Sequence, residues 1–273
     1  MSTRWTLALA AVLAASAATA QLRVECDGGN GWWGWRNGNR GHACEVRELT
    51  VPANGTLSVD AGQNGSIRIT GENRRNVEVR AVVQAWAADE AEAQRVAGAV
   101  NIRSDGGLRA EGPERGGRTG WSVSFEVLAP RESNLSLETR NGSIAVAEVR
   151  GDLELEAQNG SISLDGVAGN VRARTTNGGV DAALSGDTWE GAGLDLRTTN
   201  GGARLRLPES YSARLETATV NGGIDIDFPV TVTGRIGREL STTLGDGGPL
   251  IRVATTNGGV RISRSRAGLT RVP

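Results

Sequence analysis

The dipeptide Asn-Gly recurs at nearly regular intervals along the second half of the chain. Its asparagines are Asn141, Asn159, Asn177, Asn200, Asn221 and Asn257. They are separated by 18, 18, 23, 21 and 36 residues, so the base period is 18, and the longest gap reads as two periods with one copy missing. A fixed period near this length is typical of stacked repeats that share one continuous core.

Apolar residues alternate with polar residues on both sides of each Asn-Gly. Around Asn159, for example, Leu153 and Leu155 precede the dipeptide, and Ile162 and Leu164 follow it. A period of two is typical of half-buried β-strands. We therefore expect each unit to be strand, turn and strand, with these apolar positions facing the core.

Two topologies fit this pattern. Asn-Gly is a strong hairpin signal, which favours antiparallel pairing and a β-sandwich. Alternatively, each unit is one coil of a solenoid, and equivalent residues such as Leu153 and Val171 lie side by side in parallel strands. The solenoid is favoured because outward charges at equivalent positions, such as Glu154 and Arg172, often alternate in sign between units.

The predicted fold is therefore all-β: a β-solenoid, or right-handed β-helix, with coils of about 18 residues. In this fold the six asparagines should stack, each in the left-handed αL conformation, and each should offer its side-chain amide to the next coil. An antiparallel β-sandwich is the alternative.

The chain divides into four segments by composition and pattern. We expect a signal peptide at 1–20, a disulfide-closed, Trp-rich loop segment at 21–50, an N-terminal β-α-β part of the repeat domain at 51–130, and regular β-strand repeats at 131–273. Such a β-α-β part is well placed to cover the end of a solenoid.

Three local features depart from the regular repeat. One short, Ala-rich helix is expected at Ala87–Ala99, and the dipeptide at Asn64 is out of register with the later copies. The segment Ser185–Gly193, which carries Trp189, lengthens one unit. We expect this insertion to bulge outward, because repeats tolerate insertions at turns.

The N-terminus has the features of a secretory signal peptide. Arg4 precedes an apolar run at Leu7–Ala18, and the small residues before Gln21 suit cleavage after Ala20. We expect an exported protein, periplasmic, cell-surface or secreted. No later segment of the sequence is apolar enough to span a bilayer, so no transmembrane segment is expected in the mature chain.

Cys26 and Cys44 are the two cysteines of the chain. In an exported protein a close pair is most simply a disulfide. The loop between them carries Trp32, Trp33 and Trp35, whose flat faces could contact an envelope glycan or a protein partner. Alternatively, these side chains fold back and plug the end of the solenoid.

Candidate residues for cofactor or metal chemistry are few. His42, the single histidine, is expected to be a solvated loop residue, and with Cys26 and Cys44 it makes too few ligands for a zinc site. We predict no cofactor and no metal. The net charge of −1 argues against a nucleic-acid partner.

An enzymatic β-helix is the competing interpretation of the sequence. Asp181, Asp225, Asp227 and Arg204 could gather on one face as the site of a polysaccharide lyase or hydrolase. Most acids, however, alternate outward along strands, which is typical of a solvated sheet face.

Several stretches also resemble a known family. They include Leu205-Arg206-Leu207-Pro208, Thr219-Val220-Asn221-Gly222-Gly223-Ile224 and Gly247-Gly248-Pro249-Leu250-Ile251. Over roughly residues 51–262 they resemble the bacterial "putative adhesin" family of β-strand-repeat domains, a domain of unknown function. The resemblance implies a repetitive β fold of β-helix type, an exported or envelope-associated location and no known catalytic residues. We thus expect a non-enzymatic, adhesin-like scaffold or interaction domain at the cell envelope.

Overall fold

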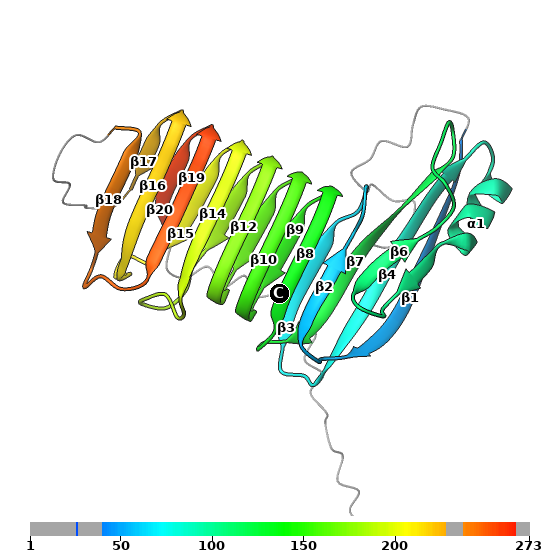
Figure 1. The fold of residues 1–273 in the computed structure, drawn as a ribbon, viewed down its shortest axis with the longest axis horizontal. Helices are drawn as coiled ribbons and strands as arrows, with labels where there is room; N and C mark the ends of the chain where they lie inside the picture. Colours follow the sequence, from blue (N-terminus) through cyan, green and yellow to red (C-terminus); the bar gives the residue numbers. More distant parts are fainter. Residues whose placement is uncertain (1–25, 27–39, 228–236, 266–273) are drawn as a thin grey trace, which may run out of the picture.

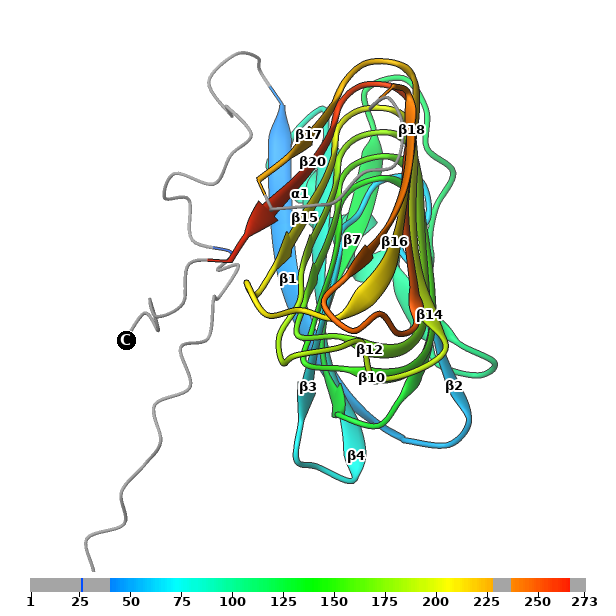
Figure 2. The same cartoon turned by 90° about the vertical axis from the view of Figure 1, so that its left-hand side faces the viewer.

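Two layers of β-sheet lie face to face and enclose one core. The computed structural model describes Cys26 and residues 40–227 and 237–265, and this part of the chain forms two ten-stranded sheets and one helix. Figure 1 shows the strands side by side along one long axis, and Figure 2 shows the two layers end-on.

In chain order the elements are β1 (Gly41–Pro52), β2 (Thr56–Asp60), β3 (Ile67–Glu72), β4 (Asn76–Ala87), α1 (Glu90–Ala99), β5 (Asn101–Arg103), β6 (Leu108–Glu111), β7 (Gly120–Pro130), β8 (Asn134–Asn141), β9 (Ile144–Ala147), β10 (Arg150–Asn159), β11 (Ile162–Asp165), β12 (Ala168–Asn177), β13 (Val180–Ala183), β14 (Gly193–Asn200), β15 (Ala203–Leu207), β16 (Ala213–Asn221), β17 (Ile224–Ile226), β18 (Glu239–Leu244), β19 (Leu250–Asn257) and β20 (Val260–Arg264).

Each Asn-Gly unit contributes one strand to each sheet, and equivalent strands pair in parallel. Leu153 of β10 pairs with Val171 of β12, and Ile162 of β11 pairs with Val180 of β13. The predicted parallel stack of equivalent residues is confirmed, and the antiparallel sandwich is wrong for the repeats. Among the described strands, antiparallel pairs occur at the two ends, in β1–β4–β7, β5–β6 and β16–β18.

The core between the sheets is built from the alternating apolar positions. Leu153, Leu155, Ile162 and Leu164 are each at most 2% exposed, as the alternation predicts. Burying each side chain of this size contributes about 2 kcal/mol. The same positions repeat from coil to coil, so the core is continuous along the stack.

The order of the coils in space differs from their order in the sequence. In one sheet β19 lies between β14 and β16, and in the other β20 lies between β15 and β17. The spacing suggested that the 36-residue gap between Asn221 and Asn257 contains one coil that has lost its Asn-Gly. This prediction is wrong. Instead, β18 returns antiparallel along β16, and the following coil inserts between the two earlier ones.

One row of outward charges favours this order, although the corresponding row on the other sheet places Arg204 beside Arg261. Across β10, β12, β14, β19 and β16 one row of side chains alternates in sign without exception. In spatial order the row is Glu154, Arg172, Asp195, Arg252 and Glu216. Stacking in sequence order would place Asp195 beside Glu216, and like charges directly opposite each other destabilise a sheet. The inserted coil supplies Arg252 between them.

The side chains of the Asn-Gly asparagines form a continuous row of hydrogen bonds. Asn159 Nδ2 donates to Asn141 Oδ1 at 2.8 Å, and Asn177 Nδ2 donates to Asn159 Oδ1 at 2.7 Å. Asn141 Nδ2 also donates to Asn64 Oδ1 at 3.1 Å, so Asn64 belongs to the row, and its expected lack of register is wrong. We call this row the asparagine ladder; in spatial order it consists of Asn64, Asn141, Asn159, Asn177, Asn200, Asn257 and Asn221.

The backbone of the ladder corrects the predicted turn conformation. Among the described non-glycine residues only Glu148 has a positive φ, at 58°, so the ladder asparagines are not in the αL region. The glycine is needed for another reason. A Cβ on Gly160 would lie 1.8 Å from the carbonyl oxygen of Gly142, so the close approach of successive coils excludes a side chain at this position.

Buried threonines add a second row of bonds inside the ladder. Thr175 Oγ1 donates to Gly160 O, and Thr198 Oγ1 donates to Gly178 O, both at 2.7 Å. The same bond is made by Thr139, Thr219 and Thr255. In the coil of Asn159 this place is taken by Ala157, which lies in register between Thr139 and Thr175.

Replacing Ala157 with threonine should therefore stabilise the protein. The new hydroxyl can donate to Gly142 O as its neighbours do, which should raise the free energy of unfolding by about 1 kcal/mol. Chemical denaturation measures the change. Ala157→Val is the matched control, because valine has the same branched shape without the donor. An equal gain in both variants would show that the added bond contributes nothing.

The helix covers one end of the core. Its cap residue Asp89 accepts a hydrogen bond from Glu92 N at 2.8 Å, so α1 begins three residues later than the predicted Ala87. The helix buries Ala93, Val96 and Ala97 against β1, β4 and β7. Figure 1 shows α1 at the end of the stack, where the expected covering role is met.

Strand β1 holds the C-terminal end of the helix. Arg47 of β1 donates to Ala97 O at 2.7 Å and also to Val100 O. Residues 41–50 are thus part of a twelve-residue strand rather than of the loop segment predicted at 21–50.

Most residues of the insertion at 185–193 are exposed, as predicted, but the side chain of Trp189 points inward. Trp189 is 3% exposed, and its Nε1 donates to Gly169 O at 2.9 Å. The expected outward bulge is therefore wrong for this side chain, because a large indole with a satisfied N–H is more stable when it is buried.

Candidate interaction surfaces

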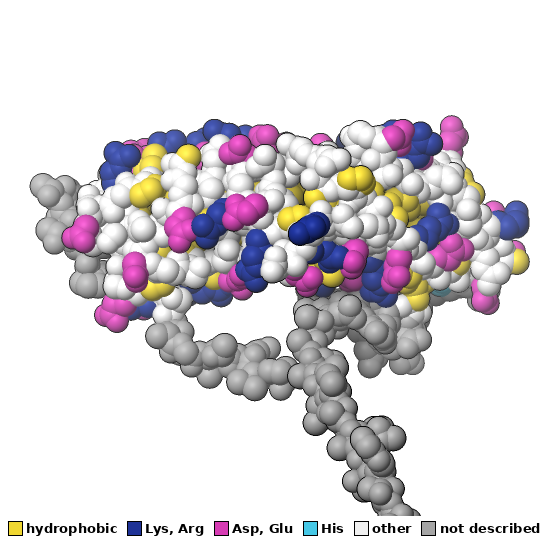
Figure 3. All heavy atoms as spheres, turned by 90° about the horizontal axis from the view of Figure 1, so that it is seen from below, with side chains coloured by type: hydrophobic (Ala, Val, Ile, Leu, Met, Phe, Trp, Pro, Cys, Tyr) yellow, Lys and Arg dark blue, Asp and Glu magenta, His cyan; other side chains and the backbone are white. Residues whose placement is uncertain are grey.

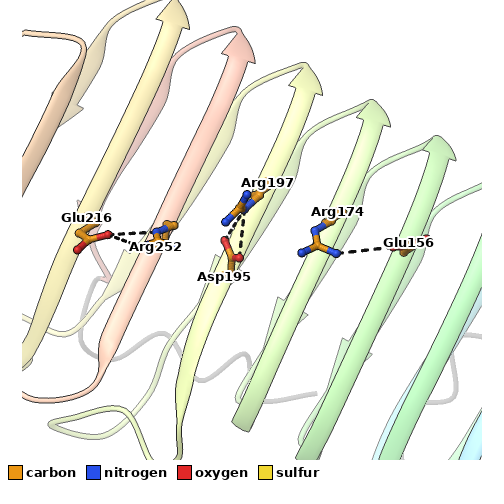
Figure 4. Close-up of polar contacts among 6 residues, drawn as sticks. All are labelled: Glu156, Arg174, Asp195, Arg197, Glu216 and Arg252. Atoms are coloured by element: carbon orange, nitrogen blue, oxygen red, sulfur yellow. Dashed lines mark hydrogen bonds and ion pairs between the residues drawn. The ribbon is translucent and has the colours of Figure 1, made fainter.

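Ion pairs cover the outer face of the sheet that contains β10, β12, β14, β19 and β16. Arg252 and Glu216 approach to 2.7 Å, Arg197 and Asp195 to 2.9 Å, and Arg174 and Glu156 to 3.9 Å (Figure 4). The hydrogen bond to Asp195 raises the pKa of the Arg197 guanidinium. Exposed pairs of this kind contribute at most about 1 kcal/mol each. Their main effect is a surface with little net charge.

A groove crosses this face close to the Asn-Gly turns, with a volume of about 620 Å³. We call it the threonine groove; its lining includes Thr176, Thr199, Thr256, Val220, Ala218 and Ala254. Val220 is 53% exposed, and Ala218 and Ala254 hold the places that arginines hold in the neighbouring coils. These short side chains produce the hollow.

A second groove of about 630 Å³ crosses the outer face of the other sheet. We call it the glycine groove; Gly179, Gly202, Gly259 and Gly223 are aligned along it. The same register position is Ser161 in the preceding coil. One side of the groove is bordered by charged residues, namely Asp181, Arg204, Arg261 and Asp225.

The candidate catalytic acids do not converge. Asp181 receives hydrogen bonds from Arg204 at 3.1 Å and from Arg206 at 2.6 Å. Asp225 receives one from Arg261 at 3.1 Å. Strands β15 and β20 separate Asp181 from Asp225, which places the two roughly 14 Å apart at the usual strand spacing. Paired carboxylates of glycosidases lie roughly 5–9.5 Å apart.

Asp227 pairs with a different arginine from Asp225. Its carboxylate lies 3.9 Å from Arg264, which pairs with Glu209 at 2.9 Å. The cluster proposed from the sequence is therefore a set of separate ion pairs along a row. A common reaction centre for Asp181, Asp225, Asp227 and Arg204 is not formed.

The edge of the stack opposite the Asn-Gly turns carries charges of both signs. Figure 3 shows acidic and basic side chains interspersed along this edge. Arg131 pairs with Glu148, and Arg150 pairs with Glu190 and Glu132. This mixing is typical of a solvated surface.

Of the candidate residues near the N-terminus, the structure describes the two cysteines but not the three tryptophans. Trp32, Trp33 and Trp35 lie outside the described residues. Cys26 and Cys44 form the predicted disulfide, with their Cα atoms 5.6 Å apart. This bond ties the segment between them to strand β1.

His42 lies on β1 and is exposed, so it is a strand residue rather than the predicted loop residue. Partial burial and the nearby charge of Arg40 lower the pKa of its imidazole. Among the described residues, no group of three or more His, Cys, Asp or Glu side chains could hold a metal ion. Also within the described residues, no helix has the length and apolar character needed to cross a membrane.

Solved structures similar to this chain share little sequence with it. A "putative cell adhesion protein" from Clostridium sporogenes is 13% identical, with a TM-score of 0.41, over 82% of this chain and 100% of that chain. A "putative adhesin" from Bacteroides fragilis is 11% identical, with a TM-score of 0.39, over 81% and 97%. A "putative lipid binding protein" from Parabacteroides distasonis is 9% identical, with a TM-score of 0.36, over 82% and 97%. Likenesses at this level carry no argument about function.

No curated protein matches the chain. The sequence model of one family, Toastrack DUF4097, matches residues 48–263. This range includes every ladder asparagine and both grooves. Since the match spans most of the sequence, the chain belongs to the Toastrack DUF4097 family.

Proposed function

We propose that the protein is an exported, non-enzymatic, adhesin-like interaction domain that binds a glycan or protein partner at the cell envelope. The observation that carries this proposal is the pairing of Asp181, Asp225 and Asp227 with arginines along open, repetitive faces. A rigid stack of coils presents an extended surface of this kind well. A polysaccharide-active enzyme would need two carboxylates to converge on one bond.

The first contact site that we propose is the loop with Trp32, Trp33 and Trp35. Cys26, which precedes these residues in the sequence, is bonded to Cys44 on the edge strand β1, and aromatic rings can stack on sugar rings or fill a pocket of a partner. The alternative role, a plug for the end of the core, is disfavoured because α1 already covers that end.

Export and coil handedness belong to the same proposal. We infer cleavage after Ala20, which the disulfide supports because such bonds persist in oxidising compartments. We also infer right-handed coils. Strands β10 and β12 are parallel in one sheet and connected through β11, and parallel crossovers are right-handed in nearly all proteins.

The test uses the mature chain on a glycan array and in co-purification from envelope fractions. Replacing Trp32, Trp33 and Trp35 together with alanine should abolish retention without changing the melting temperature, because under this proposal the rings contact a partner and contribute nothing to core packing. A matched variant, Thr176→Ala with Thr199→Ala and Thr256→Ala, tests the threonine groove in the same assays.

The outcomes separate the alternatives. Retention that survives the tryptophan triple variant while the melting temperature falls would show that the loop is structural. Loss of retention only in the threonine variant would move the contact site to the groove. Release of shortened glycan chains by the wild type, abolished by Asp225→Asn, would establish the enzyme instead.

A further inference from the structure

Every Asn-Gly dipeptide contains the reactants of its own modification. The glycine nitrogen can attack Cγ of the asparagine side chain, which forms a new C–N bond. The bond from Cγ to Nδ2 breaks, and the amide nitrogen leaves as ammonia with the proton from the glycine N–H. Water then opens the cyclic imide to aspartate or isoaspartate. A chain built on repeated Asn-Gly turns must therefore keep these two groups apart.

In the inner coils both reactants are held by the neighbouring coil. At Asn159, the nitrogen of Gly160 donates to Asn177 O at 3.0 Å. The side chain of Asn159 donates to Asn141 Oδ1 and accepts from Asn177 Nδ2. Attack requires that the hydrogen bond of the nitrogen break and that the side chain leave the ladder.

The same protection is present along most of the ladder. At each position the following glycine donates its N–H to the next asparagine carbonyl, at 3.0–3.2 Å, and the side-chain oxygen accepts an amide hydrogen. Besides Asn159, these positions are Asn64, Asn141, Asn177, Asn200 and Asn257.

Two dipeptides in the described chain lack this protection. Asn221 is the last member of the ladder, and its Nδ2 donates to Asn257 Oδ1 at 2.8 Å. Among the described residues nothing donates to its Oδ1, and nothing accepts from the nitrogen of Gly222. Asn54 lies exposed in the connection between β1 and β2, where neither its side chain nor Gly55 N has a partner among the described residues.

We propose that Asn221 and Asn54 are sites of spontaneous deamidation, and that the asparagine ladder protects the other six Asn-Gly dipeptides of the described residues. The asparagine ladder would then slow deamidation in addition to joining the coils by hydrogen bonds. It protects each coil through the coil stacked next to it and leaves the terminal coil reactive.

The consequences differ between the two sites. A carboxylate at 221 cannot donate to Asn257 Oδ1, and the amide of Asn257 is already used on Asn200. Isoaspartate would also lengthen the backbone where Gly258 N donates to Asn221 O. Modification should therefore loosen the coil of β16 and β17, whereas Asn54 has no such bonds to lose.

The experiment follows all sites in one sample. The full chain is incubated in mildly alkaline buffer at physiological temperature, and the deamidated fraction of each tryptic peptide is measured by mass spectrometry. The sequence has no lysine, and cleavage at arginine places each of the ladder residues from Asn141 onward on its own peptide. Asn54 and Asn64 share the peptide 48–68, so fragment ions assign the modified residue there. The same chain unfolded in urea gives the reference rate for every site.

In urea all sites should react at comparable rates. In the folded chain Asn221 and Asn54 should stay within a few-fold of that reference, and the six protected sites should slow at least about tenfold, as for one hydrogen bond that must first open. The proposal is overturned if Asn221 is as slow as Asn177 in the folded chain, or if Asn177 is as fast as Asn221.

A variant tests the side-chain ladder separately from the backbone bonds. Asn257→Ala removes the amide that Asn200 Oδ1 accepts but keeps the bond from Gly201 N to the backbone oxygen of residue 257. Deamidation at Asn200 should accelerate several-fold, and Asn141, far along the stack, should be unchanged. No acceleration at Asn200 in the folded variant, as judged by circular dichroism, would contradict the protective role of the side chains.

Discussion

Replacing Trp189 with alanine is expected to lower the free energy of unfolding by about 3–5 kcal/mol, the usual range for a buried tryptophan. The side chain is 3% exposed and belongs to the core that runs between the sheets. Its removal leaves a cavity and also frees Gly169 O, which accepts the indole N–H. Urea denaturation followed by circular dichroism measures the loss.

Phenylalanine at position 189 is the matched control for this prediction. It keeps most of the apolar volume but cannot donate to Gly169 O, so it should cost roughly 1–2 kcal/mol. A loss below about 1 kcal/mol for Trp189→Ala would contradict the buried position of the side chain. It would also restore the outward insertion that the sequence suggested.

The parallel stack was predictable because it depends on a local pattern repeated many times. Period-two alternation identified Leu153 and Ile162 as core residues, and the spacing of 18 set the register that pairs Leu153 with Val171. Each coil repeats the same apolar alternation around Asn-Gly, so the pattern can be recognised even though some coils are irregular.

The order of the coils could not be read from the same pattern. Equivalent residues fit any stacking order, and only interactions between distant segments distinguish them. One outward row agrees with the observed order, because Arg252 lies between Asp195 and Glu216, but on the other sheet the same order places Arg204 beside Arg261. The two rows of signs favour different orders, so charge alone would not have indicated the insertion of β19.

The candidate site was predicted less well than the fold. The disulfide between Cys26 and Cys44 followed from the count of two cysteines and from the expected export. The grooves were missed, although their signal is visible: a glycine two residues after the asparagine, as at Gly179 and Gly202, leaves the outer face without a side chain. The separation of Asp181 from Asp225 depends on the coil order and could not be inferred from spacing alone.

The prediction that the ladder asparagines adopt the αL conformation failed because Asn-Gly was read as a turn signal. In this fold the dipeptide is instead set by the packing of one coil on the next. The glycine of Asn-Gly is the point of closest approach between coils. A Cβ on Gly201 would lie 2.0 Å from Gly178 O, whereas a Cβ on Gly202 would lie 3.6 Å from its nearest neighbour, Gly259 O. Neither residue has a φ in the region that favours glycine, so conformational freedom does not distinguish them.

Gly201→Ala should therefore lower the free energy of unfolding by roughly 3 kcal/mol, because the added methyl group must push two coils apart. That displacement strains the bond from Gly178 N to Asn200 O at 3.0 Å and the bond from Thr198 Oγ1 to Gly178 O at 2.7 Å. Gly202→Ala points into the glycine groove and should be neutral or stabilise by up to about 1 kcal/mol through the unfolded chain. Equal melting shifts for these adjacent variants would show that coil contact does not select the glycine. A large difference would establish that the recurring Asn-Gly encodes the spacing of the stack.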